Sequence, residues 1–386
     1  MTPRFMSLLA VPGIALLSAV VAQEVPTLRL TSAPARLDDG FSWISSVREL
    51  ADGRVLASVS PKPSFVVLDF TSGSIDEVSR EGSGPGEYRG EVGHLRALGG
   101  DSTLAPAGEG RWLVLDGTTP VHMISAWQRG MAGMSATLAG ADASGHLLEV
   151  EATRYGTQPG ARIYQYTQNA ESLAVIIHRR PRLPSKDPIA GRPDTLAVIR
   201  GPFREVRQLV RGSYGGGGIH YTLYTILDGP EQAVMYPDGW VAIAYAIPYR
   251  VEWYTSDRNR VAGPPLPFER VRVDEKQKLA AIARDWSRSP TMFKPDEYPP
   301  WPEFLPPFQE HALVAMADGR LAIMRTPDAN VDFILYDLVD RSGRLTARLQ
   351  LRINQRLKAV TGKYAYVERR DRDDLVWLER FAWPPG

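Results

Sequence analysis

A short unit in which an Asp-Gly type of turn joins two apolar strands recurs along this chain, and this repeat constrains the fold more than any other feature. The clearest copy is SSVRELADGRVLASVS, where Asp52-Gly53 separates two apolar runs. An Asp-Gly pair in that setting indicates a tight β-hairpin. Most copies continue into a third apolar strand that carries aromatic residues. The first turns of the copies fall at Asp52, Asp101, Ser144, Asp238, Asp318 and Thr361.

The spacing of these turns predicts an all-β fold, a six-bladed β-propeller. Three of the five steps are about 40–50 residues long, which is the length of one four-stranded blade. The two longer steps leave room for a blade plus an insertion, at about residues 202–231 and 264–310, and both insertions are expected on one face. A hidden seventh blade, with strands in 194–202 and 219–227, is the alternative. We favour six blades because no further copy of the hairpin, with an Asp-Gly turn between two apolar strands, is found in 195–230.

The last copy of the repeat supplies only three strands before the sequence ends at Gly386. We expect the missing outer strand to come from the N-terminal segment Pro26–Thr31, whose apolar residues alternate. Such a pairing closes the last blade, joins the two ends of the chain and removes exposed sheet edges. A frayed N-terminal segment is the alternative.

Residues 1–22 have the pattern of a secretory signal peptide. Arg4 precedes an apolar run from Phe5 to Val21, and Val20-Val21-Ala22 fits a small-residue cleavage site. The propeller then occupies residues 23–386, and the protein is expected to be periplasmic or secreted. An uncleaved membrane anchor is the alternative, although the apolar run is short for a transmembrane span.

Composition narrows the classes of partner. The chain has no cysteine, which excludes disulfides and thiolate metal sites. It has 45 Lys and Arg against 44 Asp and Glu, so its net charge gives no sign of nucleic-acid binding. No segment after the signal approaches transmembrane length. We expect a monomer whose partner is a small molecule, a glycan or another protein.

One helix is expected within the second insertion. Asp274 is placed to cap its first turn, and Gln277 stands at the capping-box spacing. Leu279, Ile282, Ala283 and Trp286 then fall on one face of the helix.

The run Arg80-Glu-Gly-Ser-Gly-Pro-Gly-Glu-Tyr88, directly after the first copy, resembles the GxGPGEF signature of NHL-like six-bladed propellers exported by bacteria. Tyr88 stands where that signature usually has Phe. The resemblance covers most of the mature chain, and the family is one of uncharacterised proteins. It implies the propeller fold, which is shared by lactonases, quinone-dependent dehydrogenases and plain binding modules.

Candidate ligand-binding residues gather on the face opposite the Asp-Gly turns, where the other loops and the crossings between blades are expected. The candidates are Glu87, Tyr88, Arg89, His94, Arg111, Tyr249, Arg250 and Arg325. No nucleophile–base set and no metal-ligand spacing of histidines is found, so no catalytic residue, metal or cofactor is predicted.

These observations favour an exported, non-catalytic binding or scaffolding propeller. Two alternatives stay open. One is a metal-dependent hydrolase of the gluconolactonase kind, which would coordinate its cation through Glu, Asn and Asp. The other is a quinone-dependent dehydrogenase, to which His94 and Arg250 would contribute.

Overall fold

The computed structural model describes most of the chain between residues 25 and 383, so the predicted signal peptide lies outside the described residues. The parts not described within that span are 61–63, 80, 83–86, 89–92, 108–110, 126–133, 154–173, 181–193, 201–205, 215–216, 225, 228, 230 and 285–293. Within the described part, no helix has the length and apolar character needed to cross a bilayer.

The described strands form five four-stranded sheets, one five-stranded sheet and one two-stranded ribbon. The first four-stranded sheet consists of β3 (Trp43–Glu49), β4 (Val55–Ser60), β5 (Ser64–Leu68) and β6 (Ile75–Ser79). The second consists of β7 (Arg96–Gly99), β8 (Ser102–Pro106), β9 (Arg111–Asp116) and β10 (Thr119–Ser125). The third consists of β11 (Met134–Ala141), β12 (Leu147–Thr153), β13 (Ala174–Arg180) and β14 (Asp194–Arg200). The other two consist of β17 (Gln232–Met235), β18 (Val241–Ala246), β19 (Tyr249–Tyr254) and β20 (Arg260–Ala262); and of β25 (Gln355–Val360), β26 (Tyr364–Arg370), β27 (Val376–Ala382) and β2 (Ala35–Arg36).

The five-stranded sheet and the ribbon complete the list. The former consists of β21 (Phe308–Ala315), β22 (Leu321–Arg325), β23 (Phe333–Val339), β24 (Leu345–Arg352) and β1 (Thr27–Arg29), and the latter of β15 (Val206–Tyr214) and β16 (Gly217–Tyr224). The prediction of six four-stranded blades therefore needs correction, because five sheets have four strands and one has five. The segment 194–224 forms no blade of its own, since β14 completes the β11–β14 sheet and β15 pairs only with β16.

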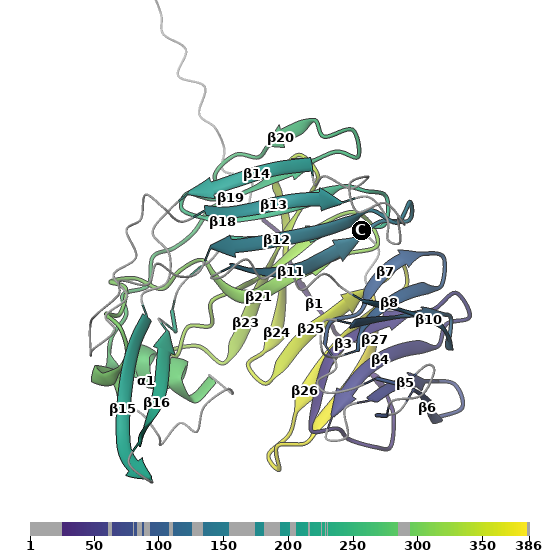
Figure 1. Cartoon of the computed structure of the whole chain (residues 1–386), viewed down its shortest axis with the longest axis horizontal. Coiled ribbons are helices and arrows are strands. Elements are labelled where there is room, and N and C mark those ends of the chain that lie inside the picture. The colour runs from purple at the N-terminus through teal and green to yellow at the C-terminus, as the bar shows by residue number, and fades with distance from the viewer. Residues whose placement is uncertain are drawn as a thin grey trace, which may run out of the picture.

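The sheets follow one another as in a β-propeller, which confirms the predicted fold class in outline (Figure 1). Each sheet contacts the next along the chain, and β25 and β27 of the last sheet contact β3 of the first. The innermost strands β7, β11, β17 and β21 make several of these contacts, and β21 also touches β25. The first strands of the sheets therefore line the centre of the ring.

The N-terminal segment pairs differently from the prediction. Thr27–Arg29 adds in parallel to the free edge of β24, where the backbone N–H of Arg348 donates to the carbonyl of Pro26 (2.8 Å). Only the next short strand, Ala35–Arg36, pairs with β27 of the last sheet. Pro26–Thr31 is therefore not the strand beside the last sheet. Two neighbouring sheets each offered a free outer edge, and the segment covers both in turn.

The predicted Asp-Gly turns have one conformation in three sheets. The carboxylates of Asp52, Asp238 and Asp318 each accept a hydrogen bond from the backbone N–H two residues later, at 3.0, 3.3 and 3.0 Å. The following glycines have φ values of 85°, 83° and 86°, which side-chain-bearing residues rarely adopt. The turn thus favours Asp and Gly at these positions, and the repeat in the sequence corresponds to the same turn in each of these three sheets.

The hydrophobic core lies between neighbouring sheets. One cluster joins the first and last sheets, with Ile44, Val55 and Leu68 from one side and Tyr366 and Leu378 from the other. A further cluster joins the β17–β20 sheet to β21–β23 in the same way. Burial of these side chains holds the ring closed between its first and last sheets, since each fully buried aliphatic side chain contributes roughly 1.5–3 kcal/mol.

The two predicted insertions pack against each other. Figure 1 shows the β15–β16 ribbon beside helix α1 (Glu275–Arg284) at one side of the molecule. Leu223 of β16 and Ile282 of α1 share a small core with Tyr298, which follows the 3-10 helix η1 (Pro295–Glu297). The insertions therefore form one shared lobe.

Helix α1 begins as predicted but faces differently. Asp274 accepts a hydrogen bond from the N–H of Gln277 (2.9 Å), which confirms the cap. The Gln277 side chain turns to the loop after β22 instead, where it meets Asp328 and the N–H of Ala329. Of the predicted face, Ile282 is buried, but Leu279 is 54% exposed because Gln277, Ala281 and Ile282 form the buried face. Trp286 lies outside the described residues.

Buried carboxylates fix the outer strands of two neighbouring sheets. Asp337 of β23 is fully buried, and it accepts hydrogen bonds from Arg325 of β22 (3.2 Å) and Arg348 of β24 (3.1 Å). Tyr249 of the preceding sheet donates a further one (2.8 Å). A buried carboxylate needs such partners, since its desolvation is otherwise costly.

Glu379 of β27 repeats this arrangement in the last sheet. It pairs with Arg369 of β26 (2.7 Å) and with Arg36 of β2 (2.8 Å). Arg36 lies opposite Glu379 in the strand pairing, just as Arg348 lies opposite Asp337. Arg36 of the N-terminal segment thus has the same role in the last sheet as Arg348 of β24 has in the neighbouring sheet.

We expect Asp337→Asn to lower the free energy of unfolding by about 2–4 kcal/mol, because it leaves Arg325 and Arg348 without their buried counter-charge. Urea denaturation followed by circular dichroism measures the change. The matched control is Asp318→Asn, whose carboxylate pairs with Arg320 and is 38% exposed. It should cost less than about 1 kcal/mol. Equal losses in the two variants would contradict the role assigned to Asp337.

Candidate functional site

Two histidines from opposite sides of the ring meet at its centre. His94 directly precedes the inner strand of the β7–β10 sheet, and His311 lies in β21. Their ring centroids are 5.6 Å apart, with the planes tilted by 32°. Both residues are exposed, so a ligand can reach them. His94 was predicted as a site residue, whereas His311 was not singled out.

A bulge in β21 places His311. The pairing of β21 with β22 is regular from Leu313 onward but shifts between Phe308 and Leu313. Within the bulge, His311 has a φ of 61°, a left-handed conformation that is unfavourable for a residue other than glycine. Bulges of this kind re-aim side chains and are frequent beside functional sites.

Hydrogen bonds from Gln232, at the start of β17, hold the bulge in place. Its side-chain amide donates to the carbonyl of Gln309 (2.7 Å) and accepts from the N–H of Ala312 (3.1 Å). The side chain of Gln309 in turn donates to the carbonyl of Ile226 (2.8 Å). The position of His311 is therefore fixed by the neighbouring sheet.

Lys358 and Trp43 bring the first and last sheets into the same region. The ammonium group of Lys358, on β25, pairs with Glu368 (2.7 Å) and donates to the carbonyl of Ile44 (2.7 Å). It lies 5.8 Å from the centre of the Trp43 ring. Trp43, the first residue of β3, is 42% exposed and donates through its indole N–H to Ser45 (2.9 Å). We call Trp43, His94, His311 and Lys358, together with Arg96 of β7, the central cluster.

The central cluster is a cationic environment. Loss of hydration at the ring centre, together with the smaller effects of the charges of Arg96, His311 and Lys358, lowers the pKa of His94 to about 3. Burial lowers the pKa of Arg96 to about 10, which still leaves it protonated at neutral pH. His94 is therefore neutral under ordinary conditions. It offers one nitrogen as a donor and one as an acceptor beside two permanent cations.

Two of the other predicted site residues lie on the first crossing. Tyr88 is fully buried, where its ring packs edge-on against Phe65 (5.1 Å), and burial raises the pKa of its phenol to about 12. Glu87 is half-buried beside Gly82. Tyr88 is thus part of the core between the first two sheets. Arg89 lies outside the described residues, as does the side chain of Arg111.

The remaining candidates separate into two groups. Tyr249 and Arg325 meet through the buried Asp337, as described above. Arg250, on the opposite face of β19, donates to Glu252 (3.0 Å) and lies over the Tyr245 ring (4.2 Å). None of these contacts involves the central cluster. Alternation along the strand separates Tyr249 from Arg250.

The sequence pattern did not reveal Trp43, Arg96, His311 or Lys358. Trp43 and Lys358 lie in strands that mix buried and partly buried residues, and His311 sits in a bulge that no Gly or Asn marks. Among the described residues, no three His, Asp or Glu side chains are grouped so that they could hold a metal ion.

No protein-family model and no curated protein matches this chain. Solved structures with a similar fold include a protein from Bacteroides fragilis NCTC 9343 described as an exported protein, at 10% identity, covering 93% of this chain and 99% of that one, with a TM-score of 0.46. Virginiamycin B lyase from Staphylococcus aureus aligns at 9% identity over 91% of this chain and 99% of its own, with a TM-score of 0.43. The calcium-binding protein regucalcin from Agrobacterium tumefaciens aligns at 11% identity over 93% and 97%, with a TM-score of 0.41. The likeness concerns the fold alone, and the predicted NHL-like family receives no support from it.

We expect the imidazole of His94 to stay neutral well below the ordinary histidine pKa of about 6.5. Its carbon-bound proton shifts in NMR spectra should not change between about pH 8 and pH 5. The variant His94→Gln assigns the signals by their disappearance. Because the unfolded chain takes up this proton below about pH 6.5 and the folded chain does not, His94 also lowers stability as the pH falls through that range. A titration midpoint of His94 near its ordinary value would contradict this.

Proposed function

We propose that this protein is an exported propeller that binds, without chemical conversion, a small ring-shaped molecule carrying a carboxylate, and that the central cluster is its binding site. The observation that carries the proposal is the meeting of His94 and His311 from opposite sides of the ring, beside Lys358 and the exposed Trp43. An exposed indole stacks on sugar or aromatic rings, and the cations favour an anionic group.

The strained bulge supports a binding role for His311. A left-handed φ at a residue other than glycine is kept only where its surroundings enforce it, and such strain gathers at functional sites. Here Gln232 and Gln309 enforce it through three hydrogen bonds. A side chain held this firmly at the ring centre is suited to contact a ligand.

The two enzymatic alternatives receive less support. A metal-dependent hydrolase of the predicted kind needs Glu, Asn and Asp side chains that converge on one cation, and no group of three His, Asp or Glu side chains among the described residues supports such a site. A quinone-dependent dehydrogenase was expected to combine His94 with Arg250, but Arg250 is engaged with Glu252 and Tyr245. The ligands in the binding assay below include quinones, so the same assay also tests the dehydrogenase alternative.

We further infer that β2 completes the last sheet through Arg36 and so closes the ring. The contacts of β25 and β27 with β3 support this closure. Residues 1–22 are proposed as the export signal, and the insertions at about 202–231 and 264–310 as one lobe on the ring.

We expect carboxylated rings such as glucuronate or benzoate to bind and glucose, the uncharged counterpart of glucuronate, to bind much more weakly. Trp43→Ala should weaken binding about three- to tenfold, because ring stacking contributes roughly 0.5–1.5 kcal/mol. His311→Ala should weaken it as well. Isothermal titration calorimetry of the mature protein measures both effects.

The matched control is Trp112→Phe, a half-buried tryptophan of β9 that is not part of the central cluster. It should leave the affinity unchanged. The proposal is wrong if glucose and glucuronate bind equally, if Trp43→Ala has no effect, or if no member of a panel of sugar acids, aromatic acids and quinones binds.

We expect the exported protein to begin at Gln23 when it is produced in a Gram-negative host, because cleavage after Ala22 follows the signal pattern. A variant that lacks residues 1–22 should stay in the cytoplasm. Intact-mass spectrometry of the periplasmic fraction identifies the first residue. Recovery of the full-length chain in the membrane fraction would favour the uncleaved anchor instead.

A further inference from the structure

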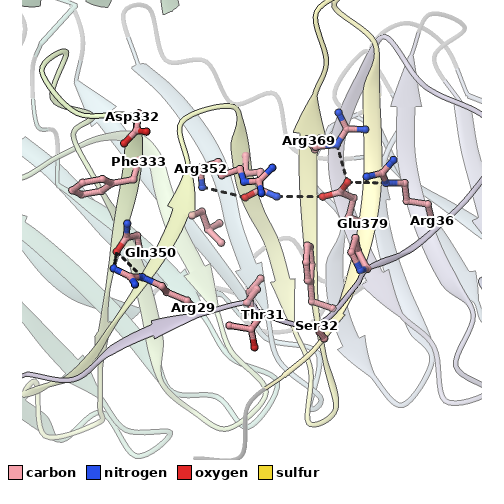
Figure 2. Close-up of a pocket in the computed structure, with 15 residues that line it drawn as sticks. Arg29, Thr31, Ser32, Arg36, Asp332, Phe333, Gln350, Arg352, Arg369 and Glu379 are labelled. Atoms are coloured by element: carbon pink, nitrogen blue, oxygen red, sulfur yellow. Dashed lines mark hydrogen bonds and ion pairs between the residues drawn. The ribbon is translucent and has the colours of Figure 1, made fainter.

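A pocket separate from the central cluster lies where the N-terminal segment passes from one sheet to the next. We call residues 30–34, between β1 and β2, the strap. Figure 2 shows the strap crossing the gap between the β21–β24 and β25–β27 sheets, with side chains of both sheets facing the space above it. The pocket has a volume of about 450 Å³, within the range of small-molecule sites.

One end of the pocket is built around Glu379. This carboxylate is 2% exposed and accepts hydrogen bonds from the Nε atoms of Arg36 (2.8 Å) and Arg369 (2.7 Å), and from the amide of Gln355 (3.2 Å). Each arginine thus spends only its Nε on the carboxylate. The terminal nitrogens of Arg36 and Arg369 make no further hydrogen bond within the described part of the chain, and both arginines are among the residues that line the pocket.

The other end carries two arginines without a carboxylate partner. Arg29 donates through Nε and one terminal nitrogen to the amide oxygen of Gln350 (3.2 and 3.1 Å), so its charge is not neutralised. Arg352, the last residue of β24, is exposed, and its guanidinium has no hydrogen bond or ion pair with any described residue. Only its backbone N–H makes a hydrogen bond, which it donates to the side-chain oxygen of Gln355 (3.1 Å).

Charge and shape together define what fits. Four arginines line the pocket against two carboxylates, those of Glu379 and Asp332, which leaves two positive charges. Leu30, Phe333, Leu351 and Phe381 supply apolar surface between them. We propose that this pocket binds a small organic dianion, with a short carbon body and either two carboxylates or one phosphate group.

The chemistry of arginine supports this class of ligand. A guanidinium presents parallel N–H groups that match the two oxygens of a carboxylate or phosphate. Arg29 and Arg352 on one side, and the terminal nitrogens of Arg36 and Arg369 on the other, provide two such places. A bare ion would leave the apolar part of the pocket unused.

The test is isothermal titration calorimetry of the mature protein with succinate, glycerol 3-phosphate, inorganic phosphate and uncharged glycerol. We expect one of the two organic dianions to bind with one molecule per chain, and glycerol not to bind. Arg352→Gln should weaken that binding about tenfold or more, since a charge-assisted hydrogen bond contributes roughly 1.5–3 kcal/mol. Arg352→Lys keeps the charge but loses the paired N–H groups. Its affinity should therefore lie between those of the wild type and of Arg352→Gln.

The matched control is Arg54→Gln, which removes one exposed arginine on the Asp52 turn that does not line the pocket. It should leave affinity unchanged, and both variants should keep the wild-type melting temperature because both side chains are exposed. Binding of succinate alone identifies dicarboxylates, and binding of glycerol 3-phosphate alone identifies phosphate esters. The proposal is overturned if neither binds, if inorganic phosphate binds as tightly as the organic dianion, or if the two variants lose affinity equally. Because these ligands have no ring and Arg352 lies outside the central cluster, the result is independent of the function proposed above.

Discussion

The pairing of a buried carboxylate with two arginines, one from each flanking strand, is the interaction on which the end of this ring depends. Asp337 receives Arg325 and Arg348 within one sheet, and Glu379 receives Arg369 and Arg36 in the next. In the second case, Arg36 is 343 residues away from its partner in sequence. An unpartnered carboxylate at 2% exposure would be strongly destabilising. The N-terminal segment is therefore held at the last sheet mainly by the ion pair between Arg36 and Glu379, because only two of its residues pair with β27.

The Arg36–Glu379 pair also determines the path of the N-terminal segment. Between Arg29 on β1 and Arg36 on β2, the chain must cross from one sheet to its neighbour. The strap makes this crossing, and its residues line a pocket together with arginines from both sheets. The same segment thus completes one sheet, widens another and forms one wall of a pocket.

Sequence reasoning recovered the features that local chemistry dictates and missed those set by register. The Asp-Gly turns were predictable because Asp52, Asp238 and Asp318 satisfy their own turns and glycine alone tolerates the next φ. Pro26–Thr31 was assigned to the wrong sheet because its alternation says that it is a strand but not which free edge it meets. Leu279 was misplaced because the polar Gln277 takes the buried position through Asp328. His94 was found, but its partner was not, since only the closed ring brings it to His311.

The bulge at His311 gives the ring centre a feature that the repeat itself does not provide. A left-handed φ costs roughly 1–2 kcal/mol in a residue other than glycine. The three hydrogen bonds made by Gln232 and Gln309 contribute about 1 kcal/mol each, which offsets that cost. Because Gln232 belongs to the adjacent sheet, the strained conformation exists only when the sheets are assembled. The placement of His311 opposite His94 is therefore a property of the closed ring, already formed in the folded chain.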